Sequence, residues 1–130
     1  MKIIGIGVDI VNNKRILSLI SNKSFIKKTF GKNEIKFSKK KVNKMNYFAK
    51  RFAAKESFAK SIGTGFRKGL NFRDIEILND KIGKPYFLIS KKIDKIITKK
   101  FKVKKFNLFL SISDEKEYSI AFTIIQAKNV

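Results

Sequence analysis

Three residue types are absent from this sequence of 130 residues: cysteine, histidine and tryptophan. Without cysteine the chain cannot form a disulfide, and without cysteine or histidine it lacks the usual ligands of zinc. A metal ion bound here must therefore be a hard cation held by oxygen atoms. The apolar run Ile3–Val8 is far shorter than the roughly 20 residues of a membrane span, and it is too short for a secretory signal. We therefore expect a soluble cytoplasmic protein with no membrane partner.

Acidic residues are scarce: 10 stand against 31 basic residues, which gives a formal net charge of +21 at pH 7. A surplus of this size often marks a protein that binds nucleic acid. Only four of the basic residues are arginine, however, and arginine is favoured for contacts with base edges and phosphates. Two explanations of the lysine surplus remain, codon bias on a solvated surface or steering toward an acidic partner.

Length and composition predict one compact domain over residues 1–130, because 43% of the chain is hydrophobic and 13 residues are phenylalanine. Such a chain can bury a core and is not disordered.

Strands are expected at 3–10, 74–78, 85–89, 106–113 and 118–126, and helices at 15–20, 24–30, 42–62 and 90–100. Ser24 is the expected N-cap of the second helix and Gly31 its end, and Lys39–Lys41 is expected in a solvated loop. This order indicates the α+β class, with a largely antiparallel sheet packed against the long helix.

The two faces of the first strand differ in character. One face carries Ile4, Ile6, Val8 and Ile10, and the other carries Ile3, Gly5, Gly7 and Asp9. Glycines on one face of a strand mark a close approach of backbone or ligand. On the long helix, Glu56 lies on the apolar stripe, four residues after Phe52 and three before Ala59. A carboxylate on the core-facing side of a helix needs a partner, because an unpaired buried charge is expensive.

If the long helix packs on the glycine-bearing face, Asp9 and Glu56 converge. Two such carboxylates are stable around a cation or with a shared proton, and Mg²⁺ beside a phosphate is commonly held in this way. Lys60, one turn after Glu56, lies beside the same site. The alternatives are a salt bridge from Glu56 to a neighbouring lysine and a helix cap made by Asp9 near Asn12. The turn Gly63–Gly65 is either a helix end or a phosphate-binding loop.

Several segments, in order along nearly the whole chain, resemble the bacterial holo-acyl-carrier-protein synthases, a short, trimeric class of 4'-phosphopantetheinyl transferases. They are Gly5–Val11 with Arg15–Ile16, Lys50–Lys60, Gly63–Gly65, Gly83–Pro85, and Ser111–Ser113 with Glu117–Ala121. The segment on the long helix is the most specific of them. The resemblance implies Mg²⁺-dependent transfer of the phosphopantetheine arm of coenzyme A to a serine of apo-acyl carrier protein. Release of 3',5'-ADP completes this reaction of fatty acid biosynthesis.

The roles of individual residues follow from the same resemblance. Asp9 and Glu56 match the residues that hold Mg²⁺ in the family, and Glu56 and Lys60 are the candidates for catalysis. The candidates for binding coenzyme A are Arg51, Lys60, Gly63, Thr64, Gly65, Lys84 and Pro85. Arg15, together with Lys14, is expected to dock the acidic carrier protein. The family further implies a homotrimer whose active sites are shared between neighbouring subunits.

Because there is no histidine, the base is a water on the metal oriented by Glu56, which we favour, Glu56 acting through water, or Lys60 with a depressed pKa. Lys60 fits better as a cation that stabilises the pyrophosphate.

Asp114 stands where many relatives have a histidine near the nucleotide, and an aspartate there repels phosphate unless it points elsewhere. The segment 30–44 matches the family poorly.

A basic nucleic-acid-binding module is the alternative function. It requires lysine and aromatic side chains gathered on one face, and an affinity that falls steeply with salt. The phenylalanines lie on apolar stripes instead, and Asp9 and Glu56 would hinder a phosphate tract unless a metal fills their site. We therefore expect no nucleic-acid partner. A transferase fold retained only as a scaffold is a third hypothesis.

Overall fold

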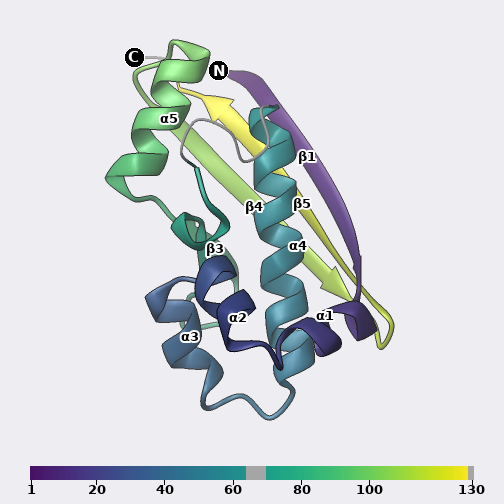
Figure 1. Ribbon diagram of the computed structural model, residues 1–130. Helices are drawn as coiled ribbons and strands as arrows, with labels where there is room; N and C mark the ends of the chain where they lie inside the picture. Colours follow the sequence, from purple (N-terminus) through teal and green to yellow (C-terminus); the bar gives the residue numbers. More distant parts are fainter. Residues whose placement is uncertain (64–69, 129–130) are drawn as a thin grey trace.

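Figure 1 shows the computed structural model, which describes residues 1–63 and 70–128. Its elements, in chain order, are β1 (Lys2–Asn12), α1 (Asn13–Leu19), α2 (Lys23–Thr29), α3 (Lys32–Ser38), α4 (Lys44–Ile62), the 3₁₀ helix η1 (Phe72–Asp74), β2 (Glu76–Asn79), β3 (Pro85–Leu88), α5 (Lys91–Phe101), β4 (Phe106–Asp114) and β5 (Tyr118–Ala127). The α+β class expected from the sequence is confirmed.

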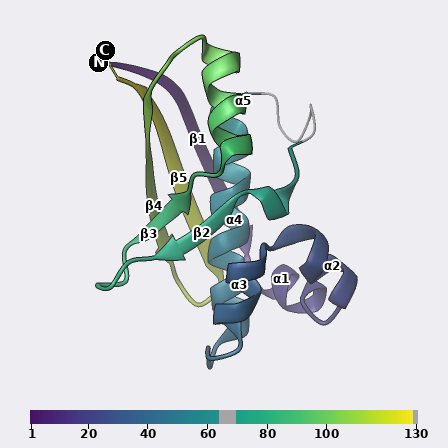
Figure 2. The same ribbon diagram turned by 90° about the vertical axis from the view of Figure 1, so that its left-hand side faces the viewer.

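The strands of the described residues form two antiparallel sheets. One has three strands in the order β1-β5-β4, and the other is the hairpin of β2 and β3. Helix α4 packs along one face of the three-stranded sheet, and α1, α2 and α3 gather around its N-terminal end (Figures 1 and 2). Strand β3 contacts β4, so the hairpin lies at the β4 edge of the sheet and β1 forms the opposite edge.

The core is built around the aromatic side chains of α4. Phe48 and Phe58 are buried, and their ring centroids lie 4.6 Å from that of Phe30 and 5.3 Å from that of Phe87, respectively. Burial of rings of this size supplies much of the stability of a small domain. These phenylalanines are therefore committed to the core and are not available to stack on bases.

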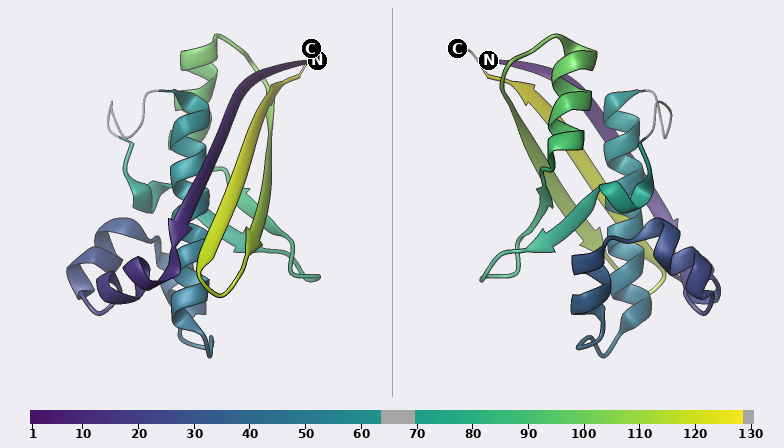
Figure 3. Two further views of the ribbon diagram at one scale, coloured as in Figure 1. Left: turned by 90° about the vertical axis from the view of Figure 1, so that its right-hand side faces the viewer. Right: turned by 60° about the vertical axis from the view of Figure 1, so that its left-hand side comes forward.

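Gly5 and Gly7 of β1 pack directly on α4, as the sequence predicts (Figure 3, left). The predicted faces are wrong for the two residues before them, because a register shift between Ile3 and Gly5 leaves Ile3 exposed and lets Ile4 pack against the core. A Cβ atom on Gly7 would lie 2.7 Å from the backbone nitrogen of Ser61 and still closer to the carbonyl oxygen of Ser57. A Cβ on Gly5 would overlap the carbonyl of Ser61. Only glycine allows the two backbones to approach this closely, and this approach places Asp9, two residues after Gly7, against the same helix.

We expect Gly7→Ala to destabilise the protein by about 1–3 kcal/mol or more, because the added methyl group must push β1 away from α4. The displaced strand should also carry Asp9 away from α4. Chemical denaturation measures the first effect. Lys99→Ala, on the exposed side of α5, is the control and should leave the midpoint unchanged. An unchanged midpoint for Gly7→Ala would contradict the tight packing.

The N-terminal half departs from the expected elements in two places. Helix α2 is capped by Asn22, whose Oδ1 accepts from the backbone nitrogens of Ser24 and Phe25, so the predicted cap at Ser24 is wrong. Gly31 does not merely end that helix but is the N-cap of α3, which the sequence pattern did not predict. A glycine at the N-cap has no side-chain oxygen, so the usual sequence signal of a helix start is absent.

The remaining elements agree with the expectations to within a few residues. Helix α4 ends at Gly63, whose φ of 85° is the left-handed conformation of a glycine C-cap. The strand expected from residue 74 begins instead at Glu76, because η1 occupies the residues before it. Lys39–Lys41 is exposed outside the helices, as expected. In residues 1–63 and 70–128, no helix has the length and apolar character required to cross a bilayer.

Candidate active site

Asp9 lies on the inner face of β1, opposite Ala121 of β5, and its side chain is only 15% exposed. Its Oδ1 accepts a hydrogen bond from Lys60 Nζ at 2.9 Å. The cap of α1 is made by Asn12, whose Oδ1 accepts from the nitrogen of Lys14 at 2.9 Å. The proposal that Asp9 caps this helix is therefore wrong, and its carboxylate faces α4.

Lys60 stands at the edge of the site on the last turn of α4. Besides its bond to Asp9, its Nζ donates to the carbonyl oxygen of Val8 at 3.2 Å. The side chain is 56% exposed. Such a surface ion pair contributes little stability, so the ammonium can leave Asp9 for an incoming anion at small cost.

Glu56 lies one turn before Lys60 and is half-buried. Burial is the main reason that the pKa of Glu56 is raised, the charge of Asp9 raises it further, and Lys60 and Arg15 oppose the shift. Glu56 forms no ion pair with any residue in the described part of the chain, so the salt-bridge alternative is not observed. The two carboxylates therefore lie within electrostatic reach of each other, as the sequence predicts.

The chemistry of this donor set fits Mg²⁺. Asp9 and Glu56 offer hard oxygen atoms from two different elements, β1 and α4. Among the described residues, no group of three or more histidine, cysteine or acidic side chains is arranged to hold a metal. A complete protein cage is not needed, because Mg²⁺ commonly uses one or two carboxylates and takes its other ligands from water and substrate phosphates.

The other predicted coenzyme-binding residues are spread over the molecule. Arg51 is buried on a different side of α4, where its guanidinium stacks 3.7 Å from the ring of Tyr47 and donates to Asn79 Oδ1. Lys84 and Pro85 lie on the β2–β3 hairpin, and Lys84 is exposed. Their contacts with coenzyme A, like that of Arg51, stay predictions. Gly63 is the exposed C-cap of α4, and the predicted residues Thr64 and Gly65 lie outside the described residues.

Asp114, at the end of β4, contacts the N-terminal end of α4. Its Oδ2 accepts from Asn46 Nδ2 at 2.5 Å. Both residues line an open polar pocket of about 350 Å³, whose other lining residues are Asn13, Asn43, Met45, Glu115 and Lys116. The amide of Asn46 thus donates a hydrogen bond to one oxygen of the Asp114 carboxylate, the group expected to repel phosphate.

A buried ion pair that was not predicted from the sequence joins Lys55 and Glu34, both 0% exposed, with Nζ and Oε1 2.6 Å apart. A signal for Lys55 was present, because it lies three residues after Phe52 and three before Phe58 and so shares the buried side of α4. No comparable signal marks Glu34, because α3 itself was not predicted.

A sequence model of the 4'-phosphopantetheinyl transferase superfamily matches residues 5–123. The chain belongs to this superfamily. Curated relatives include the holo-[acyl-carrier-protein] synthase of Pelagibacter ubique strain HTCC1062, which is 58% identical over 128 residues. The alignment covers 98% of this chain and 100% of that protein. The holo-[acyl-carrier-protein] synthase of Wolbachia pipientis strain wPip is 43% identical over 95% of this chain and 97% of its own length.

Solved structures of phosphopantetheinyl transferases share the whole fold. The holo-[acyl-carrier-protein] synthase of Neisseria meningitidis matches with a TM-score of 0.84 and 37% identity, over 95% of this chain and 98% of that one. The holo-(acyl-carrier-protein) synthase of Bacillus anthracis str. Ames, in complex with CoA (3',5'-ADP), matches with a TM-score of 0.81 and 32% identity. This match covers 98% of this chain and 100% of that one. The family resemblance found in the sequence is confirmed.

Proposed function

We propose that this protein is a holo-acyl-carrier-protein synthase of fatty acid biosynthesis, acting in the cytoplasm. It transfers the 4'-phosphopantetheine arm of coenzyme A to a serine hydroxyl of apo-acyl carrier protein and releases 3',5'-ADP. The observation that carries the proposal is the convergence of Asp9, Glu56 and Lys60 at the contact of β1 and α4. The 58% identity to a holo-[acyl-carrier-protein] synthase supports it.

Asp9 and Glu56 are the residues that would hold Mg²⁺. When bound, the ion neutralises charge on the coenzyme A pyrophosphate and so lowers the barrier to attack. Lys60 supplies a second positive charge, since its ammonium already lies at this site and is half-exposed. Holding both charges in fixed positions is the electrostatic part of catalysis.

The transfer forms one bond and breaks one. The oxygen of the carrier serine bonds to the β-phosphorus, and the bond from this phosphorus to the bridging oxygen breaks, so 3',5'-ADP leaves with that oxygen. The serine proton passes through water to Glu56. Glu56 lies one turn before Lys60 at this site, so its carboxylate can accept this proton through water.

The coenzyme site is proposed to span two subunits. In one chain, Lys84 and Pro85 lie on the hairpin at the β4 edge, whereas Asp9 lies on β1 at the opposite edge. Arg51, Lys60, Gly63, Thr64 and Gly65 complete the proposed set of contacts. Association of copies would allow residues from two edges to meet around one coenzyme molecule.

Three copies are proposed to associate through the outer face of the three-stranded sheet. This face is 37% to 59% exposed at Ile6, Val8, Ile10, Phe109, Ile120 and Phe122. Val8 faces Phe122 and Ile10 faces Ile120 across β1 and β5, so the apolar side chains are contiguous. A contiguous apolar face usually marks an interface between proteins, and the number three follows from the family resemblance.

Phe122→Glu is expected to convert the trimer to monomers, because it places a charge in the centre of this apolar face. Sedimentation velocity measures the mass in solution. Val42→Glu, which changes a fully exposed valine in the loop between α3 and α4, is the control and should leave the mass of three chains unchanged. A wild-type protein that sediments as a single chain would contradict the proposed assembly.

Docking of the acidic carrier protein is assigned to Arg15 and Lys14 at the start of α1. Both side chains are exposed, and Arg15 lies close enough to Glu56 to lower its pKa. A carrier held by these cations would therefore present its serine near the carboxylates. Opposite charges on two surfaces mainly speed and orient such encounters.

Arg15→Glu should raise the KM for carrier protein by about tenfold or more, because it replaces attraction by repulsion. The KM for coenzyme A should change much less. Lys95→Glu, an equal change of charge on the exposed side of α5, should alter the carrier KM by no more than about twofold. Equal effects of the two variants would show that only net charge matters and would overturn the assignment.

Release of 3',5'-ADP provides the test of the reaction. Chromatography should detect one 3',5'-ADP for each carrier molecule modified, and none when the acceptor serine of the carrier is replaced by alanine. Release without a carrier serine would indicate hydrolysis of coenzyme A instead of transfer. No release with several bacterial carrier proteins would contradict the proposed function.

A further inference from the structure

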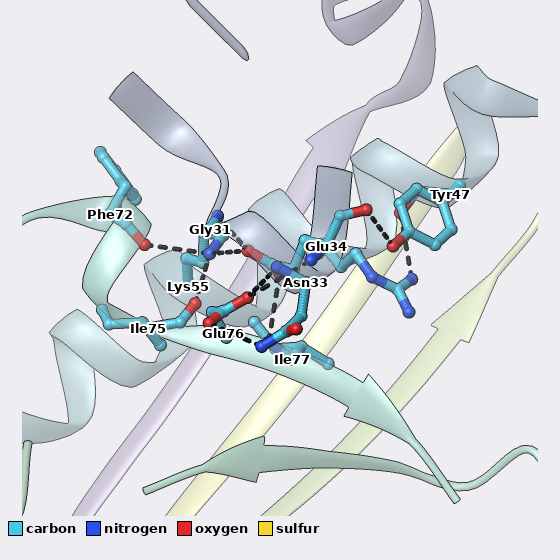
Figure 4. Close-up of polar contacts among 10 residues, drawn as sticks. Gly31, Asn33, Glu34, Tyr47, Lys55, Phe72, Ile75, Glu76 and Ile77 are labelled. Atoms are coloured by element: carbon cyan, nitrogen blue, oxygen red, sulfur yellow. Dashed lines mark hydrogen bonds and ion pairs between the residues drawn. The ribbon is translucent and has the colours of Figure 1, made fainter. Parts of the chain in front are cut away.

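A fully buried charge cluster lies on the side of α4 that faces α3 and β2 (Figure 4). Lys55 Nζ donates to Glu34 Oε1 at 2.6 Å, to the carbonyl oxygen of Phe72 at 2.9 Å and to the carbonyl oxygen of Ile75. All three donors of the ammonium group are therefore used. Burial lowers the pKa of Lys55 and raises that of Glu34, while their mutual attraction opposes both shifts.

The carboxylates extend this cluster into β2. Glu34 also accepts from the nitrogen of Gly31 at 2.9 Å and from the nitrogen of Ile77 at 3.1 Å. The next carboxylate, Glu76, accepts from the nitrogens of Asn33 and Glu34 at the start of α3. Gly31 leaves room for this carboxyl group, because a Cβ atom there would force the side chain of Glu76 to move. Helix α4, helix α3 and strand β2 are thus joined by charged groups.

A second connection lies one turn earlier on α4. Arg51 donates to Asn79 Oδ1 at the end of β2, and Asn79 Nδ2 donates to the carbonyl oxygen of Gly83 at 2.9 Å. Lys84 and Pro85 follow directly. The hairpin is therefore attached to α4 at both ends of β2, once through Lys55 and once through Arg51.

Stability alone does not account for a buried ion pair, because the cost of desolvating both charges often exceeds their attraction. Hydrogen bonds with strict geometry do fix how elements lie against each other. We propose that Lys55 is a positioning residue that, with Glu34, holds the β2–β3 hairpin in the orientation in which Lys84 and Pro85 receive coenzyme A. The inference rests on the proposed function for its substrate.

The main test is the double variant Lys55→Met with Glu34→Gln, which removes both charges and keeps the side-chain lengths. We expect it to fold, to raise the KM for coenzyme A by at least about tenfold, and to leave the KM for carrier protein within about twofold. Amide exchange over residues 76–88 should become faster. A folded double variant with unchanged KM and unchanged exchange would overturn the proposal.

Two further variants keep the test decisive. Asn79→Ala removes the second connection from an exposed position and should raise the coenzyme A KM by about threefold or more, even if the double variant does not fold. Lys92→Met removes a surface ion pair of 2.8 Å between α5 and Asp74 of η1, and both readouts should stay at wild-type values. A coenzyme A KM that is unchanged in Asn79→Ala would overturn the proposal. If the wild type transfers nothing, the proposed function fails, while the exchange rates still test the positioning of the hairpin.

Discussion

Replacing Asp9 or Glu56 by alanine is expected to lower kcat/KM for phosphopantetheine transfer by about 10³-fold or more. Each change removes half of the carboxylate pair that would hold Mg²⁺, and Glu56→Ala also removes the proton acceptor. Neither side chain belongs to the hydrophobic core. The fold should therefore survive, and loss of the unfavourable interaction between the two carboxylates should leave the melting temperature equal to or above that of the wild type.

Steady-state kinetics with excess Mg²⁺ measures this effect, and a thermal melt of each variant establishes that it is folded. Asp94→Ala, which removes an exposed carboxylate from α5, is the matched control and should keep nearly full activity. Full activity in Asp9→Ala or Glu56→Ala would remove the metal assignment. Equal losses in all three variants would indicate a general effect of charge.

The single variant Lys55→Met should destabilise the protein by about 3–5 kcal/mol. It leaves Glu34 charged and fully buried without its counter-ion, and the carbonyl oxygens of Phe72 and Ile75 lose a donor. Adding Glu34→Gln should recover at least about half of this loss, because no net charge then remains in the core and the amide oxygen can still accept from the backbone.

Urea denaturation of the wild type, both single variants and the double variant gives the coupling energy between Lys55 and Glu34. A positive recovery in the double variant is the expected result. If the double variant is less stable than Lys55→Met, removing the charge of Glu34 does not offset the loss of Lys55. The electrostatic description of this cluster would then be wrong.

The carboxylate pair could be predicted from the sequence because two simple periodicities meet there. Gly5, Gly7 and Asp9 alternate along a strand, and Glu56 shares a helical stripe with Phe52. A face without side chains can only be filled by a closely packed neighbour, and α4 is the long helix of the chain. The physical constraint therefore pointed to a pair of residues 47 positions apart (56 minus 9).

The buried charge cluster could not be predicted in the same way. Its geometry depends on α3, whose first backbone nitrogens donate both to Glu34 of the helix itself and to Glu76 of β2, and the second of these partners lies more than 40 residues away in the sequence. The contact of Arg51 with coenzyme A stays a prediction from the family resemblance, whereas its partners within the chain, Tyr47 and Asn79, come together only in the folded structure. Long-range polar contacts of this kind leave no period in a single sequence.

Intact-mass spectrometry of an apo-acyl carrier protein tests the central claim most directly. The carrier is incubated with this protein, coenzyme A and Mg²⁺, in parallel with a sample that contains EDTA. We predict a gain of one phosphopantetheine mass on the carrier that disappears with EDTA and returns when Mg²⁺ is added in excess. A carrier whose mass never changes, although coenzyme A binds the protein, would contradict the assignment as a phosphopantetheinyl transferase of carrier proteins. A mass gain that persists in EDTA would contradict the role given to Asp9 and Glu56.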